Sequence, residues 1–398
     1  MTVYWLLSVP AHGDGHAAWR DLKSQVGAAE VCDFELPQLK IGTLDTLVQL
    51  SDELGKYDAA YEATVGKFVE TLGSLTGATG AGLAAMLRVE ERTVDQYLRG
   101  FAWNSAKYRW ERPLGEVVGQ IAAGMGAIDA QLKTKLAQHS ALKNSLATVR
   151  RRQTGNLSVR ALGGVVGRDD CVAGSEYLQT VFVAVPRTLA REWLNGYERL
   201  TDMVVPRSSR RIAEDSEYIL YSAVVFRRVV DEFATKARDM RFVVRDFEYD
   251  EAAIERERAS AAEIAEQEAE LLDNITEWLR GSFGDVFEAW IHIKALRVFV
   301  ESVLRYGIPP DFLPVLVRPP ARSADRIRRG LADYYAHLET SSGASQRARL
   351  AGKARPAKGG GASADGGAFD MHEFSSVLSS EYTPFVFFEI PWTGVVED

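Results

Sequence analysis

Cysteine is scarce in this sequence: Cys32 and Cys171 are the only two among 398 residues. Two cysteines provide no disulfide framework, and such usage is typical of proteins in a reducing compartment. We interpret both as small buried hydrophobic residues rather than reactive thiols. Long apolar runs are also missing, since no stretch reaches the ~20 residues that a bilayer-spanning helix needs. We therefore expect a soluble, cytosolic protein that meets a membrane only indirectly, through a partner.

An excess of positive charge is lacking as well. The chain has 47 basic and 55 acidic side chains, and its net charge of −8 disfavours general binding to nucleic-acid phosphates. The sequence contains no phosphate-binding Gly-x-x-x-x-Gly-Lys-Ser/Thr loop, no Gly-x-Ser-x-Gly and no His-Glu-x-x-His. His12, Asp14 and His16 lie close in sequence, but no fourth ligand cluster accompanies them. We therefore predict no catalytic residue, no cofactor, no metal site and no nucleic-acid partner.

The segment 12–18 is the strongest enzyme-like feature. It contains Gly-x-Gly-x-x-Ala between a predicted strand and a predicted helix. Asp33 lies twenty residues after Gly13, where dinucleotide-binding proteins place an acidic ribose ligand. A nucleotide-dependent oxidoreductase is therefore one alternative. We favour a Gly-rich turn, because the segments that follow do not alternate as β-α-β.

The periodicity of apolar residues predicts a mixture of strands and helices. Near the N-terminus, strands are expected at 3–9 and 31–36, with a helix at 16–27 between them and a long helix from Leu44. In the middle of the chain, strands are expected at 178–185, 218–226 and 242–249, with helices at 187–200 and 227–239. Towards the C-terminus, the pattern predicts a strand at 313–317, a helix at 324–338 and a strand at 385–390.

Two long helices with a continuous apolar seam are the most informative feature. The first begins at Pro113, a residue that suits the first turn of a helix, and its apolar a and d positions continue to Val149. Lys135 and His139 interrupt this seam. They indicate either local tolerance where the seam opens or polar residues that specify the register. The second helix covers 250–306 and has a seam of the same period.

The second helix has two unusual segments. Gly281 and Gly284 predict a kink or a break. The segment 286–305 is apolar on nearly all sides, so it must be buried, and we interpret His292 within it as a core histidine. A narrow polar stripe remains, whose members are three or four residues apart and can pair along one face: Lys294, Arg297, Glu301 and Arg305.

The two seams can bury each other if the helices lie antiparallel, and the first and last strands can then share one sheet. The predicted fold is α/β (α+β): an elongated dumbbell with two globular α/β domains joined by a neck of long antiparallel helices. Its predicted parts are a foot domain from 1–112 and 307–398, neck helices at 113–153 and 250–306, and a head domain at 154–249. Within the foot, 340–368 is expected to be a flexible loop. This shape suits a non-catalytic connector.

Arginine-rich segments supply the candidate partner-binding residues. The turn 204–211 carries Arg207, Arg210 and Arg211. It is either a solvated loop or a contact for an acidic partner, since guanidinium groups bind carboxylates bidentately. Arg245 and Asp246 complete the candidate set. The basic residues of 347–358 are interpreted as a solvated loop, with contact to an acidic protein, filament or lipid as the alternative.

Five segments together resemble the C subunit of the V-type proton ATPase. They follow the family order across nearly the whole chain, and the last is long enough to be specific: 4–8, 42–54, 203–209, 242–247 and 289–307. The sequence departs from the family in the Gly-rich stretch 73–82 and the Lys/Gly-rich stretch 343–367. Both departures fall in predicted loops and put only local contacts in doubt.

The resemblance implies a non-catalytic stator subunit, with head, neck and foot, of a pump that couples ATP hydrolysis in other subunits to proton transport. It implies binding to the E–G heterodimers of the peripheral stalks and to the N-terminal cytosolic part of the a subunit. It also implies a place on the cytosolic face of vacuolar or endosomal membranes, reversible assembly of the pump, and actin as a further partner. A cytoskeletal coiled-coil adaptor outside any pump is the remaining alternative.

Overall fold

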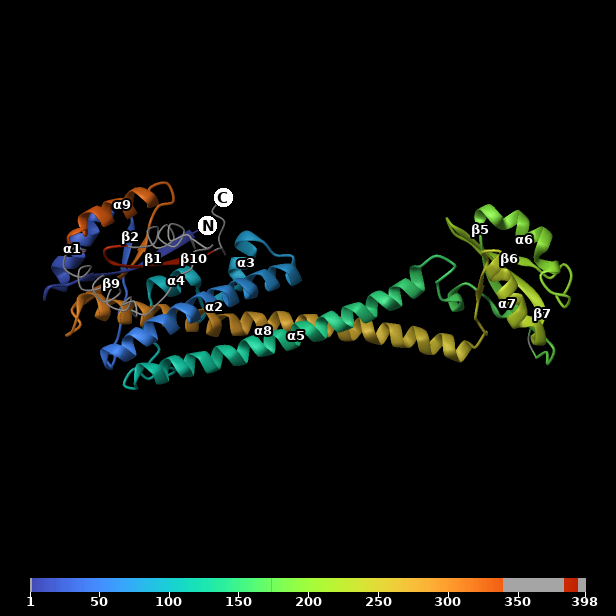
Figure 1. Cartoon of the computed structure of the whole chain (residues 1–398), viewed down its shortest axis with the longest axis horizontal. Coiled ribbons are helices and arrows are strands. Elements are labelled where there is room, and N and C mark those ends of the chain that lie inside the picture. The colour runs from blue at the N-terminus through green and yellow to red at the C-terminus, as the bar shows by residue number, and fades with distance from the viewer. Residues whose placement is uncertain (1, 173, 339–382, 393–398) are drawn as a thin grey trace, which may run out of the picture. The chain divides into compact units, whose positions relative to one another are not determined.

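The computed structural model describes residues 2–172, 174–338 and 383–392 (Figure 1). The chain divides into two compact units: unit 1 combines Met1–Lys133 with Ile275–Asp398, and unit 2 is Thr134–Asn274. The helices α5 (Leu114–Thr154) and α8 (Glu251–Tyr306) each have residues in both units. The predicted mixture of helices and sheets is confirmed. The dumbbell shape stays a prediction, and the predicted loop 340–368 falls among residues outside the described ranges.

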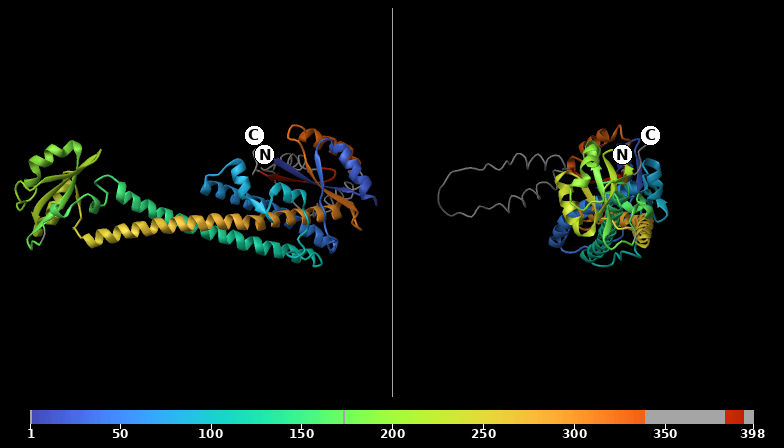
Figure 2. Two further views of the ribbon diagram at one scale, coloured as in Figure 1. Left: turned by 180° about the vertical axis from the view of Figure 1, so that it is seen from behind. Right: turned by 90° about the vertical axis from the view of Figure 1, so that its right-hand side faces the viewer.

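The sheet of unit 1 joins the two ends of the chain, as predicted. Its strands have the order β10-β1-β9-β2, and all neighbours are antiparallel: β1 (Thr2–Pro10), β2 (Glu30–Asp33), β9 (Phe312–Arg318) and β10 (Val386–Trp392). The second strand is shorter than expected, because its pairing with β9 ends at Asp33. The helices α1 (Gly15–Val26) and α9 (Ala324–Tyr334) pack beside each other on one face of this sheet (Figures 1 and 2).

Unit 2 repeats this topology. Its strands have the order β6-β7-β5-β8: β5 (Leu178–Pro186), β6 (Arg210–Glu214), β7 (Tyr218–Phe226) and β8 (Val243–Arg245). The helices α6 (Ala190–Gly196) and α7 (Val230–Asp239) follow β5 and β7. Both sheets therefore have the β-α-β-β-α-β order of a ferredoxin-like fold, with the first strand between the third and fourth. In unit 1, everything from α2 to α8, including unit 2, is inserted between the second and third strands.

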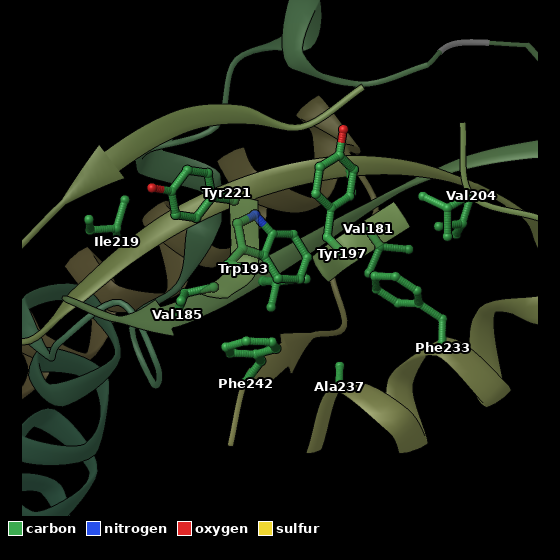
Figure 3. Close-up of a cluster of buried hydrophobic side chains, with 13 residues drawn as sticks. Val181, Val185, Trp193, Tyr197, Val204, Ile219, Tyr221, Phe233, Ala237 and Phe242 are labelled. Atoms are coloured by element: carbon green, nitrogen blue, oxygen red, sulfur yellow. The ribbon is translucent and has the colours of Figure 1, made fainter. Parts of the chain in front are cut away.

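The core of unit 2 is built around Trp193 from α6 (Figure 3). The indole is fully buried, its ring stacks on Tyr197 at 5.5 Å, and its Nε1 donates to the Ser209 hydroxyl at 3.0 Å. The edges of Phe233 and Phe242 face the same ring at 6.3 and 5.4 Å. Alternate residues of β5 and β7 close this core, while the opposite face of the sheet is covered by residues of 157–166. The predicted strand 242–249 is paired only over β8, because the ladder to β5 ends at Arg245.

The part of α8 that belongs to unit 1, from Ile275 to Tyr306, is enclosed on three sides, as its apolar surface requires. The helix α2 (Leu44–Thr76) covers one side, with the Phe68 and Trp278 rings 5.7 Å apart. The sheet covers a second side, where the Ser302 hydroxyl donates to that of Ser8 at 2.7 Å. The segment 101–108 covers the third, with its aromatic rings around His292.

Of the kink or break expected at Gly281 and Gly284, the break is wrong, since α8 is helical without interruption from Glu251 to Tyr306, while the kink stays a prediction. Gly284 instead allows a close approach of two backbones. A Cβ at this position would lie 3.2 Å from the Arg88 carbonyl oxygen and 3.6 Å from the Val89 Cα. These residues form β3 (Arg88–Val89), which pairs with β4 (Arg92–Thr93) between the short helices α3 (Gly80–Met86) and α4 (Val94–Arg99).

Alanine substitutions should affect stability differently at Gly281 and Gly284. Gly281→Ala meets no atom within 4 Å, so it should raise the free energy of unfolding by roughly 1 kcal/mol, the usual gain of alanine over glycine in a helix. Gly284→Ala should show none of this gain, because its methyl group meets a backbone carbonyl. Urea unfolding of the two variants measures the difference. Equal stabilisation by both would show that β3 does not constrain this position.

Candidate interaction sites

The Gly-rich turn after β1 is closed by groups of the protein itself. The Gly13 N–H donates to the Asp311 carboxylate at 2.7 Å, and the Asp14 carboxylate accepts from the Ala17 N–H at 3.0 Å. Two of the N–H donors that could face a pyrophosphate are therefore already used within the protein. Strand β9 also lies between β1 and β2, so Asp33 is not on the neighbouring strand as a dinucleotide site requires. The oxidoreductase alternative is not favoured.

A buried charge cluster joins α2 to α8. The Asp58 carboxylate, 4% exposed, accepts from the Trp290 indole at 2.8 Å, from the Lys294 amine at 3.0 Å and from the Arg297 guanidinium at 2.8 Å. Burial lowers the pKa of Lys294, and the Asp58 charge opposes this effect. Lys294 and Arg297 of the predicted stripe therefore pair with α2. The other two also contact neighbouring elements: Glu301 accepts from Ser51, and Arg305 donates to carbonyls that precede β10.

A cleft of about 570 Å³ opens beside this cluster. Its charged lining residues are balanced in sign: Asp58, Glu62, Glu301 and Glu389 against Lys294, Arg297, Arg305 and Arg328. Four acidic and four basic groups give no preference for a ligand of either charge. We therefore assign the cluster to the folding of unit 1 rather than to partner binding.

Replacing Asp58 should expose the cost of this burial. Asp58→Asn leaves the ammonium group of Lys294, itself 3% exposed, without its counter-charge. Breaking a buried pair in this way typically costs ~3–5 kcal/mol. We expect a loss of this order in urea unfolding of the full chain. Asp52→Asn is the matched control, because Asp52 lies exposed on the same helix and should change stability little. Similar unfolding of the two variants would contradict the assignment.

His292 is held in its neutral form by two opposite hydrogen bonds. Its Nδ1–H donates to the Glu288 carbonyl oxygen at 2.8 Å, while its Nε2 accepts from the Asn104 N–H at 3.0 Å. A second ring proton, on Nε2, would face this N–H donor and break the hydrogen bond. Burial, the largest effect, lowers the pKa of His292 to about 4, although the Glu288 carboxylate nearby favours the charged form and Lys107 opposes it. The prediction of a core histidine is confirmed.

The stability of unit 1 should therefore depend on pH through His292. The folded state binds a proton less readily than the unfolded state, whose histidine titrates near 6.5. The contribution of neutral His292 to the free energy of unfolding is complete above pH 6.5. It is lost as the pH falls towards about 4, by roughly 3 kcal/mol in total. In urea unfolding at several pH values, the free energy of unfolding of His292→Gln should lack this part of the decrease with falling pH. His16→Gln, at an exposed histidine, should keep the full pH dependence of the parent chain. The same pH dependence in His292→Gln would contradict the role of His292.

One polar interruption of the first seam, His139, contacts a carboxylate of the second long helix. The His139 imidazole of α5 lies 3.1 Å from the Glu268 carboxylate of α8, and both side chains are mostly buried. A polar pair at matching heights on two helices disfavours shifted registers, because a shift would leave both groups buried without a partner. This contact favours the register interpretation of His139.

The predicted Arg-bearing turn is a fixed loop at the edge of the unit 2 sheet. The Val205 N–H donates to the Val224 carbonyl at 2.9 Å, which holds the loop beside β7. Arg207 has a φ of +59°, and its N–H donates to the Glu198 carboxylate at 2.8 Å. This bond and one from the Tyr197 hydroxyl hold the pKa of Glu198 below its usual range. A non-glycine residue with positive φ is uncommon and is found more often at functional sites.

The other candidates differ in how far the fold already engages them. Arg210 and Arg211 are exposed on β6; Arg211 pairs with Glu214 at 2.5 Å, whereas Arg207 and Arg210 have no acidic partner among the described residues. Arg245 donates to the carbonyls of Ser158 and Arg160, so its guanidinium positions an internal segment. Asp246 is exposed just after β8. The sequence did not reveal Glu198 as the anchor of the loop, because glutamate beside tyrosine has no distinctive pattern.

Within residues 2–172, 174–338 and 383–392, histidine, cysteine and carboxylate side chains form no group that could hold a metal ion. In the same part of the chain, every helix is too short or too polar to cross a bilayer.

Comparison with known proteins gives one consistent family. A family model for the V-ATPase C subunit matches residues 4–386. The V-type proton ATPase C subunit of Manduca sexta is 39% identical over 345 residues, which cover 86% of this chain and 90% of that protein. That of Caenorhabditis elegans is 36% identical over 392 residues, covering 97% and 96%. The C subunit 1 of the V-type proton ATPase of Mus musculus is 37% identical over 348 residues, covering 86% and 91%.

Proposed function

Because the chain belongs to the V-ATPase C-subunit family, we propose that it is the stator component that links E–G peripheral stalks to the N-terminal cytosolic part of the a subunit. It is a non-catalytic component of a proton-transporting ATPase, and ATP is hydrolysed in other subunits of the complex. Through these partners the chain would lie on the cytosolic face of vacuolar or endosomal membranes. Breaking such contacts in turn would permit reversible assembly.

The observation that carries the proposal is the fixed loop 204–211. Glu198 and β7 hold the backbone of this loop, and Trp193 donates to the Ser209 hydroxyl, so the Arg207 and Arg210 side chains are presented from a fixed base. Preorganised arginines lose less conformational entropy on binding, and their guanidinium forks match carboxylates. An acidic helical surface, such as that of a charged stalk, is the partner that this chemistry fits. We assign this surface of unit 2 to one E–G heterodimer.

Unit 1 would then hold the second E–G heterodimer and the a subunit. The repeated β-α-β-β-α-β topology supports this division, because each unit has its own sheet and core and can dock as a separate body. Several moderate interfaces on one chain add up to strong attachment through effective concentration. No contact among the described residues supports the cytoskeletal alternative or actin binding.

Replacing Arg207 by glycine tests the unit 2 surface without harming the fold. Arg207→Gly removes the guanidinium and also relieves the positive φ, so the variant should be at least as stable as the parent chain. Affinity for purified E–G heterodimer, measured by titration calorimetry, should fall about tenfold, as expected for a contact worth ~1.4 kcal/mol.

Arg241→Gly is the matched control. Arg241 is also exposed, in unit 2, and has a φ of +63°, but it follows α7 instead of belonging to the loop. It should leave E–G affinity unchanged. If both variants bind like the parent, the loop is not the contact; if the parent chain does not bind E–G at all, the stator role itself is wrong.

A further inference from the structure

A second feature of unit 2 is a cleft of about 330 Å³ that the proposed stalk contacts do not use. It is bounded by the last turns of α5, the segment 160–164 and the first turns of α8. The Gly163 backbone packs closely against the Ile254 side chain, since a Cβ on Gly163 would lie only 2.7 Å from the Ile254 Cγ1. The Ala161 N–H donates to the Arg152 carbonyl at 2.6 Å, and Arg245 holds the Ser158 and Arg160 carbonyls. The cleft is therefore bounded by packed, hydrogen-bonded backbone.

The lining combines an apolar base with a basic rim. The apolar lining residues are Val149, Ala161, Ile254 and Ala261. The rim carries Arg152, Arg160 and Arg258, whose guanidinium groups have no hydrogen-bond or ion-pair partner among the described residues. Glu257 is the sole carboxylate among the described residues that line the cleft, so two positive charges remain in excess. The cleft is thus basic, although the net charge of the chain is −8.

We propose that this cleft binds a short acidic segment of a protein partner, one with an apolar side chain next to its carboxylates. The guanidinium groups suit carboxylates, and the apolar base needs an aliphatic or aromatic group to displace its water. A free small anion fits less well, because ion pairs at exposed arginines contribute little each. A segment that fills the base and engages several arginines at once combines these contributions.

The test uses the full chain and a fluorescein-labelled peptide, acetyl-Glu-Glu-Leu-Glu-Glu-Phe-amide, followed by fluorescence anisotropy. Two variants remove different parts of the site. Arg152→Glu reverses one rim charge. Gly164→Leu changes no charge, and since a Cβ on Gly164 meets nothing within 4 Å, its side chain should project into open space and fill the cleft. Saturable binding by the parent chain should weaken at least tenfold in each variant.

Arg151→Glu is the control for charge, because Arg151 is exposed one residue earlier and does not line the cleft. It should bind the peptide like the parent chain, as should Arg207→Gly, and no variant should melt below the parent temperature. The proposal is overturned if the peptide does not bind saturably below about 1 mM, if Gly164→Leu binds normally, or if Arg151→Glu weakens binding as much as Arg152→Glu. Displacement of the peptide by equimolar inorganic phosphate would also overturn it, because that result identifies a small-anion site instead.

Discussion

The structure of unit 1 depends on the burial of one helix. From Val286 to Val303, α8 presents apolar side chains in nearly every direction, so no arrangement that leaves a side in water is stable. A sheet face, α2 and the segment 101–108 each cover part of it. The ammonium group of Lys294 is tolerated inside because Asp58 reaches it from α2, and the same carboxylate also orders Trp290 and Arg297. One acidic residue on a neighbouring helix thus makes this enclosure possible.

This enclosure explains how a sheet with a long insertion stays whole. Strands β1 and β2 come from the start of the chain, and β9 and β10 come from its last third, with α8 leading directly back into the sheet. The hydroxyl groups of Ser302 and Tyr306 tie the end of α8 to Ser8 of β1. Because the returning helix is fixed against the first strand, β9 and β10 reach their places beside it. The insertion can then carry a second unit without loss of the first core.

The surfaces outside these cores differ in how they use charge. Around Asp58 the fold neutralises its own ionic groups, so this cluster has little charge left for a partner. On unit 2, Arg207 and Arg210, and separately Arg152, Arg160 and Arg258, are held by ordered backbone but have no ion pair among the described residues. A protein without catalytic chemistry acts through its contacts. Unpaired cationic groups on an ordered backbone are the feature by which such contacts gain both affinity and selectivity.

The sequence by itself determined the elements whose signal is local. The apolar run of β1, the seams of α5 and α8 and the all-round apolar segment near His292 predicted the main helices and strands within a few residues, and the matched segments identified the family. Only the tertiary structure decided which partner each polar residue meets. Asp58 lies 236 residues from Lys294, the close contact of Gly284 is with a hairpin distant in sequence, and the fixed conformation of Arg207 depends on Glu198. Periodicity reports which face of an element is buried, whereas pairing across long sequence separations depends on how those faces are brought together in space.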